Sequence, residues 1–280
     1  MIRKFLHKIK KNILNFIAIK KVDILSQYIK TAPNCQNTLN IFKDEWLSWS
    51  PEKFDVVDDN QIKFKDERIS WAAKVFGNFE DKTILELGPC EAGHTYMIHN
   101  MGARNILAIE ANTRAFLKCL IIKEIFELNR AKFLCGDFVQ FLMQSNQVFD
   151  YTIASGVLYH MTNPVELIAL IAKSTTKAVL VCVHYYDSEL IENCDENVKR
   201  KFVAKEEFEY EGFKHTLYKQ VYLEALGWKG YRGGSQTYSN WLSRKEIFDA
   251  FLYFGFTLIE IGIDDVKHPL GPCVTFAAFK

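Results

Sequence analysis

A glycine-bearing loop at residues 88–93 is the first segment whose residue types indicate a bound ligand. It reads Gly88-Pro89-Cys90-Glu91-Ala92-Gly93 and directly follows an apolar run, 83–87. A dinucleotide-binding loop would carry glycine at the third position and offer bare amides to the pyrophosphate. Here Cys90 replaces that glycine, Pro89 has no amide proton, and the Glu91 carboxylate would oppose a phosphate by about 1–4 kcal/mol. The loop therefore predicts a nucleotide-like ligand without phosphates.

Apolar runs and segments of helical period alternate on both sides of this loop. The runs lie at 83–87, 105–110, 131–136, 149–154 and 177–183, and the helical segments at 92–101, 113–129, 138–145 and 163–173. This alternation predicts a parallel sheet covered by helices on both faces, with the loop at the carboxyl end of its first strand. A helix at 243–254, opened by a Ser243/Glu246 capping box, and strands at 256–263 and 273–279 complete the pattern.

Acidic residues at the ends of these runs, taken with the loop, resemble the class I S-adenosylmethionine-dependent methyltransferase family. Glu86-Leu87-Gly88 is similar to the family's first motif, whose acid positions the methionine part of the cofactor. Glu110 is similar to the acid that binds both ribose hydroxyls, because a carboxylate can accept two hydrogen bonds. Asp137 falls where the family binds the adenine amino group, and Phe138 is placed to stack on the adenine ring.

The resemblance implies S-adenosylmethionine as cofactor and a Rossmann-like, doubly wound, mostly parallel seven-stranded sheet with an antiparallel last strand. It covers residues 79–184 well and 241–280 more loosely. We therefore predict an N-terminal helical extension, 1–78, followed by a methyltransferase domain, 79–280. The cofactor-binding residues expected on this basis are Glu86, Gly88, Cys90, Gly93, Glu110, Asp137, Phe138, Ser155 and Tyr159.

The residues after the fourth and fifth strands are expected to face the methyl acceptor. Methyl transfer from a sulfonium needs an aligned nucleophile and, for some acceptors, the removal of one proton. His160 and His184 are the candidate catalytic bases, because the unperturbed pKa of histidine lies near neutrality. Each could instead pack beneath the cofactor or cap a helix. No metal site is expected, since the seven cysteines lack the spacing of zinc ligands.

Residues 185–240 interrupt the alternation and are rich in tyrosine, glutamate, lysine and glycine. Connections this long in a compact domain are usually functional or disordered, and the aromatic residues favour the first alternative. We expect a cap insertion over the acceptor site, with Arg232, Tyr238 and Trp241 as substrate-binding residues. The same three residues could simply hold the insertion on the core.

The first thirty residues are basic and amphipathic. They hold eight lysines and arginines and a single acid, Asp23, which leaves the other 250 residues with a net charge of about −6. Their apolar spacing predicts a helix over 1–30 that either packs on the body or lies on an anionic membrane. No run approaches the ~18 apolar residues of a membrane span, and no signal peptide is evident. We expect a cytoplasmic protein, held in the second case at the inner membrane surface.

The segment Gly156-Val157-Leu158-Tyr159-His160, followed by Asn163-Pro164, bears on the acceptor. It is similar to enzymes that carboxymethylate wobble uridine in transfer RNA, and to methyltransferases of cell-envelope glycans and secondary metabolites. A transfer-RNA enzyme needs a basic face, whereas this body is acidic. We therefore expect a small-molecule or glycan acceptor, with nucleic acid as the weaker alternative. The third alternative is a cofactor-binding protein without catalysis, or a peripheral-membrane interaction protein, on the same scaffold.

Overall fold

The computed structural model describes residues 24–46 and 64–280. They divide into two compact units, 24–41 and 42–280, each described here by itself. The first unit holds a 3-10 helix, η1 (Ile24–Gln27), and a short helix, α2 (Cys35–Leu39), whose N-terminus is capped by Asn34. Most of the predicted helix 1–30 lies outside the described residues. Its described end, 24–30, contains the single 3-10 turn η1.

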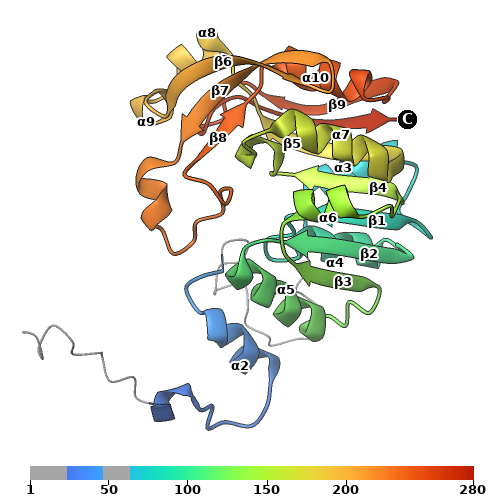
Figure 1. Ribbon diagram of the computed structural model, residues 1–280. Helices are drawn as coiled ribbons and strands as arrows, with labels where there is room; N and C mark the ends of the chain where they lie inside the picture. Colours follow the sequence, from blue (N-terminus) through green and yellow to red (C-terminus); the bar gives the residue numbers. More distant parts are fainter. Residues whose placement is uncertain (1–23, 47–63) are drawn as a thin grey trace, which may run out of the picture. The chain divides into compact units, whose positions relative to one another are not determined.

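Seven strands form the main sheet of the second unit, in the order β3-β2-β1-β4-β5-β10-β9 (Figure 1). Strands β1 to β5 pair in parallel, whereas β10 runs antiparallel to both β5 and β9. The predicted Rossmann-like sheet with an antiparallel last strand is confirmed. Strand order reverses beside β1, where ligands bind in sheets of this kind. The strand bounds are β1 Thr83–Leu87, β2 Asn105–Glu110, β3 Ala131–Cys135, β4 Phe149–Ser155, β5 Thr175–His184, β9 Leu258–Asp265 and β10 Cys273–Phe279.

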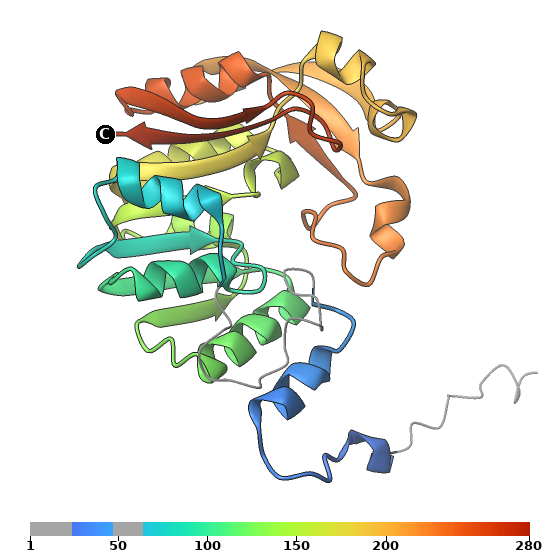
Figure 2. The same cartoon turned by 180° about the vertical axis from the view of Figure 1, so that it is seen from behind.

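Helices cover both faces of this sheet (Figures 1 and 2). One face carries α6 (Phe138–Gln144), α7 (Pro164–Ser174) and α10 (Arg244–Tyr253), which pack on one another, and the other carries α3 (Glu67–Val75) and α4 (Gly93–Asn100). The last seven residues of β5 are all buried, as expected for a central strand that is covered on both faces. A further helix, α5 (Thr113–Ile125), joins β2 to β3.

Side-chain caps fix where the helices begin, and this positions the loops that precede them. The predicted capping box is present at α10, where the Ser243 hydroxyl accepts from the amide of Glu246 and the Glu246 carboxylate accepts from the amide of Ser243. Asp137 caps α6 and Asn163 caps α7 in the same way. Each cap supplies a partner for amides that the first helical turn leaves unpaired.

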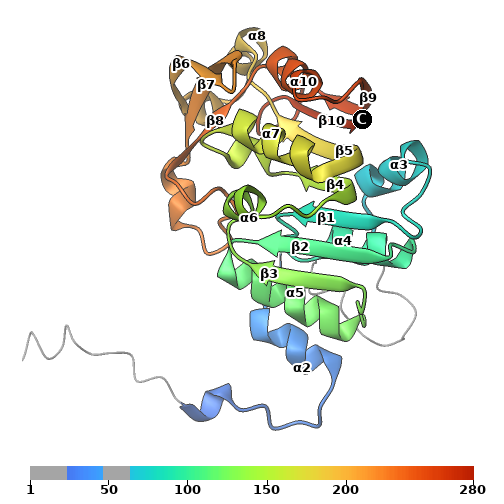
Figure 3. The same ribbon diagram turned by 45° about the vertical axis from the view of Figure 1, so that its right-hand side comes forward.

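Residues 185–240 form mainly a three-stranded antiparallel sheet, β6-β7-β8, which the sequence pattern did not indicate. Nearly every residue of β6 is exposed, so that strand lacks the alternation of apolar and polar residues by which strands are recognised. Residues 222–237, which connect β7 to β8, lie on the side to which the arrowheads of β1 and β4 point (Figure 3). The elements are α8 Ser188–Glu192, α9 Glu196–Lys199, β6 Phe202–Tyr210, β7 Phe213–Val221, η5 Leu223–Gly227 and β8 Tyr238–Trp241.

The predicted boundary between residues 78 and 79 stays a prediction. Helix α3 precedes that boundary and packs against β9 and β10 within the unit that holds the main sheet. Among the helices of the described residues, none is both long enough and apolar enough to cross a membrane.

Candidate functional site

A cavity of about 900 Å³ lies at the carboxyl ends of β1 to β4. The segments that follow these strands line it, and residues of the β7–β8 connection and of the segment before α3 complete its wall. A volume of this size is at the upper end of the range for small-molecule sites. The cavity is lined by Glu45 and by residues of the segments 64–68, 88–97, 110–118, 137–140, 155–166 and 229–236.

The loop after β1 curls tightly because several of its residues adopt left-handed backbone conformations. Gly88 has φ +64°, and Cys90 and Ala92 have φ +57° and +59°. A Cβ at position 88 would lie 2.9 Å from Cγ1 of Val157, so the chain needs glycine there for both conformation and space. Non-glycine residues rarely adopt this conformation, and its presence at Cys90 and Ala92 marks a constrained loop at the cavity wall.

The carboxylate of Glu110, at the end of β2, is held by two backbone amides. One oxygen accepts from the amide of Cys90 at 3.0 Å and the other from that of Asn112 at 2.8 Å. Glu110 is 8% exposed, and this burial raises its pKa, although the two amide hydrogen bonds act in the opposite direction. Each oxygen keeps a second lone pair. The carboxylate is therefore fixed in position at the cavity wall and can still accept hydrogen bonds from a ligand.

Asp137 and Phe138 lie at the cavity wall where β3 gives way to α6. Oδ1 of Asp137 accepts from the amide of Val139 at 2.8 Å, which is the capping bond of α6. Phe138 is 7% exposed and belongs to the hydrophobic core. Asp137 thus serves as a helix cap and as a cavity residue at once.

His160 and Tyr159 form the part of the wall that follows β4. Nδ1 of His160 lies 3.0 Å from the hydroxyl of Tyr222, and the two rings of Tyr159 and His160 are 4.2 Å apart between centroids. Burial, with a smaller contribution from His184, lowers the pKa of His160 to about 4. The ring is therefore neutral at pH 7.

Comparison with known proteins identifies the family. Residues 78–242, more than half of the chain, match the family described as Methyltransferase domain. The chain belongs to this methyltransferase family. The predicted S-adenosylmethionine-dependent class, and with it the enzyme type and cofactor, is confirmed. No curated protein sequence matches this methyltransferase.

Solved structures share the fold of this methyltransferase at low sequence identity. The N-terminal domain of EvdMO1, crystallised in the presence of SAH and D-fucose, is 17% identical, with a TM-score of 0.62 over 88% of this chain and 94% of that one. Magnesium protoporphyrin IX methyltransferase from Synechocystis PCC 6803, with bound SAH, is 13% identical, with a TM-score of 0.50 over 80% and 90%. At such identities the likeness concerns the fold alone.

Most residues predicted to bind the cofactor of this methyltransferase do come together in the cavity wall. Glu86 does not line the cavity, because it is 1% exposed beneath the loop, where its Oε2 accepts from the Thr95 hydroxyl at 2.5 Å. Its Oε1 has no hydrogen-bond partner among the described residues, and burial raises its pKa. The residues that do line the cavity are Gly88, Cys90, Gly93, Glu110, Asp137, Phe138, Ser155 and Tyr159.

The charge argument from Glu91 was wrong. Its carboxylate is 1% exposed and forms an ion pair with the Lys118 ammonium at 2.8 Å. Lys118 also donates to the carbonyl of Glu45. Because the negative charge of Glu91 is compensated within the protein, it does not repel a ligand. The exclusion of a pyrophosphate depends instead on Pro89 and Cys90.

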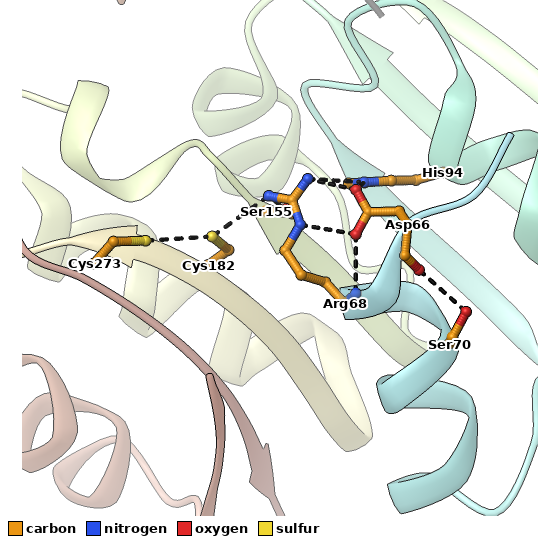
Figure 4. A network of polar contacts seen from close by, with 7 residues as sticks. All are labelled: Asp66, Arg68, Ser70, His94, Ser155, Cys182 and Cys273. Carbon is orange, nitrogen blue, oxygen red and sulfur yellow. Dashed lines mark hydrogen bonds and ion pairs between the residues drawn. The ribbon is translucent and has the colours of Figure 1, made fainter. Parts of the chain in front are cut away.

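Three residues of a polar cluster at the cavity, Asp66, Arg68 and His94, were missed from the sequence, whereas its fourth member, Ser155, was predicted (Figure 4). The Asp66 carboxylate binds the Arg68 guanidinium and Nε2 of His94, at 2.5 and 2.9 Å. Arg68 reaches on to the Ser155 hydroxyl at 3.1 Å, and all four residues line the cavity. Burial raises the pKa of Asp66, but the hydrogen bonds from His94 and Arg68 outweigh it and hold that pKa well below its usual value. Only Asp66 gave a local signal, as an N-cap of α3.

Two thiols continue this cluster on the far side of Arg68 (Figure 4). Sγ of Cys182 lies 3.5 Å from the Arg68 guanidinium and 3.7 Å from Sγ of Cys273. The hydrogen bond from Cys273, together with the nearby Arg68 charge, lowers the pKa of Cys182. Neither thiol lines the cavity.

Of the residues predicted to face the methyl acceptor, some line the cavity and others do not. Arg232 lines the cavity, but His184, Tyr238 and Trp241 do not. His184 is 7% exposed; its Nδ1 donates to the carbonyl of Gly271 at 2.8 Å, and its ring stacks on Trp241. Trp241 is 2% exposed. The Lys219 ammonium nitrogen lies over the Tyr238 ring, 4.1 Å from its centroid. The rings of His184 and Trp241 therefore pack against each other away from the cavity, whereas Tyr238 packs against the neighbouring strand of the insertion.

Proposed function

We propose that this methyltransferase acts on a small molecule or a glycan, held in the cavity beside His160 and loop 229–236. The observation that carries the proposal is that one cavity of about 900 Å³ contains Glu110, on the expected cofactor side, together with His160 and Arg232. Such a volume accommodates a cofactor together with a small acceptor. A nucleic acid would need an extended basic surface in addition.

The cavity residues fit S-adenosylmethionine, which supplies a methyl group already activated on a sulfonium. Glu110 offers its remaining lone pairs to the ribose hydroxyls, and Asp137 and Phe138 suit the amino group and ring of adenine. On the methionine side, Arg68 offers charged N–H donors to the carboxylate.

The acceptor contacts that we propose are Tyr159, His160 and Arg232. In-line displacement requires the nucleophile to be aligned with the methyl group, and the two packed rings provide a rigid surface for that purpose. The similar fold of the EvdMO1 domain, which was crystallised in the presence of SAH and D-fucose, supports an acceptor of sugar size.

Isotope transfer tests this proposal. The protein is incubated with cell extract and S-adenosylmethionine that carries a deuterated methyl group, and the label is followed by mass spectrometry in separated fractions. Label is expected in the small-molecule or glycan fraction and not with the Glu110→Ala variant. Label confined to the transfer-RNA fraction would overturn the acceptor class, and no label in any fraction would contradict the activity.

We also propose that residues 1–30 hold the protein against an anionic membrane surface. The segment carries eight basic residues, and its described end exposes Ile24, Leu25, Tyr28 and Ile29 by 59–66%. Apolar side chains beside basic ones suit the boundary between headgroups and acyl chains. Sedimentation with vesicles containing phosphatidylglycerol is expected, and should be lost on deletion of residues 1–30 or with phosphatidylcholine alone. Equal sedimentation of the shortened protein would refute the proposal.

A further inference from the structure

The hydroxyl group of Tyr222 connects His160 to loop 229–236. It lies 3.0 Å from Nδ1 of His160 and accepts a hydrogen bond from the amide of Gly234 at 3.2 Å. Gly234 packs so closely that a Cβ at this position would lie 2.3 Å from the carbonyl oxygen of His160. Tyr222 is itself only 7% exposed. The three residues therefore form one packed unit beside the cavity.

The hydrogen bonds around this hydroxyl decide where its proton points. A phenol has one proton to donate and two lone pairs to accept with. The amide of Gly234 can only donate, so it occupies a lone pair of the Tyr222 oxygen. The hydroxyls of Tyr231 and Ser239 also lie near the Tyr222 oxygen, and each has an acceptor of its own, the Gly234 carbonyl at 2.9 Å for Tyr231 and Oε1 of Gln220 at 3.4 Å for Ser239. Among the described residues, the strongest acceptor within reach of the Tyr222 proton is Nδ1 of His160, at 3.0 Å, because an imidazole nitrogen is a better hydrogen-bond acceptor than a hydroxyl oxygen.

We propose that Tyr222 fixes the ring of His160 with its proton on Nε2, so that His160 donates a hydrogen bond to the methyl acceptor instead of removing its proton. Tyr222 is then a positioning residue, which acts through His160. The inference rests on the proposed function in one respect, namely that the acceptor lies beside His160. The arrangement replaces the general-base role expected from the sequence.

The surroundings of His160 keep its ring neutral, as the proposal requires. Its pKa is lowered by burial and by the nearby His184, whose own Nδ1 is committed to the Gly271 carbonyl. The third titratable ring, Tyr159, stays protonated because burial raises its pKa as well. A neutral imidazole has one proton and one acceptor nitrogen. When Nδ1 accepts from Tyr222, the proton is on Nε2.

A donor at this position restricts the chemistry of the acceptor. The Nε2–H group can bond to a lone pair on a hydroxyl, carbonyl or carboxylate oxygen, whereas an ammonium group has no lone pair to offer. The acceptor group that contacts His160 therefore presents a lone pair on an oxygen or on an uncharged nitrogen, and is not an ammonium. Any proton that this atom carries leaves to another group or to water.

Nitrogen NMR of the full-length protein tests the tautomer directly. Histidine labelled with ¹⁵N in the ring is incorporated, SAH is added, and long-range proton–nitrogen spectra report which nitrogen of each ring is protonated. The signals of His160 are assigned by their loss in His160→Gln. The expected result between pH 6 and 8 is a protonated Nε2 and an unprotonated Nδ1. A protonated Nδ1, in the neutral ring or in an imidazolium, would overturn the proposal.

A pair of matched variants tests the part played by Tyr222. Tyr222→Phe removes the donor, so the population with a proton on Nδ1 should rise from minor to substantial. Tyr253→Phe, whose hydroxyl bonds to the Glu211 carbonyl, should leave the His160 spectrum unchanged. An unchanged tautomer in Tyr222→Phe would refute the inference. Because these spectra require no methyl acceptor, their result is independent of the isotope-transfer experiment, and the wild-type spectrum remains decisive if Tyr222→Phe fails to fold.

Discussion

The backbone amide of Cys90 donates to the carboxylate of Glu110 at 3.0 Å, which ties the loop after β1 to the end of β2. The two residues are twenty positions apart in the chain. The contact requires the loop to turn back on itself, as the left-handed conformation of Gly88 permits. The glycine loop and the acid thus form one preorganised wall of the cavity, and the first three predictions concern it.

Replacement of Glu110 by glutamine should weaken SAH binding by about tenfold to a hundredfold, or ~1.4–2.8 kcal/mol. The amide keeps the shape of the side chain but places a donor opposite one of the two backbone N–H groups. Isothermal calorimetry measures the effect. The control is Glu124→Gln, the same substitution at an exposed residue. Equal affinity in the two variants would remove Glu110 from the cofactor site.

As the pH falls, SAH binding should weaken at a higher pH than it would if Glu110 had the pKa of an ordinary glutamate. Burial raises the pKa of Glu110 above the usual ~4.3, and binding needs the ionised form, so affinity is present above the raised pKa and lost as pH falls through it. Titration of the dissociation constant against pH checks this. Glu110→Gln should lack this dependence, and a slope shared by both proteins would assign it to another group.

Alanine at position 88 should lower both stability and SAH affinity. Its φ of +64° costs about 1–2 kcal/mol for a residue with a Cβ, and that Cβ would press on Val157. Gly77→Ala is the matched control variant, because Gly77 also has a left-handed conformation, with φ +88°, but has open space around it. Thermal unfolding should show a loss in both variants, whereas calorimetry should show weaker SAH binding only in Gly88→Ala. Normal binding by Gly88→Ala would contradict the proposed role of the loop.

Breaking the buried pair of Glu91 and Lys118 should be costly. Lys118→Met leaves the carboxylate buried without its cation and should destabilise the protein by about 3–5 kcal/mol. Lys245→Met removes an exposed ion pair with Asp249 and should change stability by no more than about 0.5 kcal/mol. Denaturant unfolding of the two variants distinguishes these values. Similar small losses would show that Glu91 is neutralised in another way.

The Asp66 cluster should make stability depend on pH in the acid range. The pKa of Asp66 is lowered in the folded state, so its contribution is complete above the unfolded value of ~3.9 and is lost as pH falls below it. Asp66→Asn keeps the cap of α3 but loses the charge, and should be less stable than wild type at pH 7 by about 1–3 kcal/mol. That difference should shrink below about pH 4. Asp187 is an N-cap residue without an ion pair among the described residues. The difference in stability between Asp187→Asn and the wild type should therefore be the same at pH 7 and in acid.

Local features of the sequence were sufficient for much of the sheet and for the adenosine side of the site. The apolar runs at 83–87 and 105–110 are β1 and β2, with the same bounds. Strands that are buried on both faces are apolar along nearly their whole length, which makes them recognisable in the sequence. Glu110 and Asp137 were found because each ends or follows a predicted strand, at a position where the methyltransferase family carries an acid. The Ser243/Glu246 box depends on residues three apart, and was readable for that reason.

Other features depended on contacts between distant parts of the chain. His94 and Ser155, which join Asp66 and Arg68, are 28 and 87 positions away along the chain. Likewise, the sequence could not reveal that Lys118 neutralises Glu91, or that His184 is packed away from the cavity while His160 faces it. The sequence alone determined the alternation of strands and helices, because this follows from local periodicity. Its resemblance to a known family supplied the cofactor class and the roles of the acids at the strand ends, because the motifs of that family are local in the chain. Only the tertiary structure decided which charges are compensated and how the His160 ring is bonded, because those depend on side chains that meet after the chain has folded.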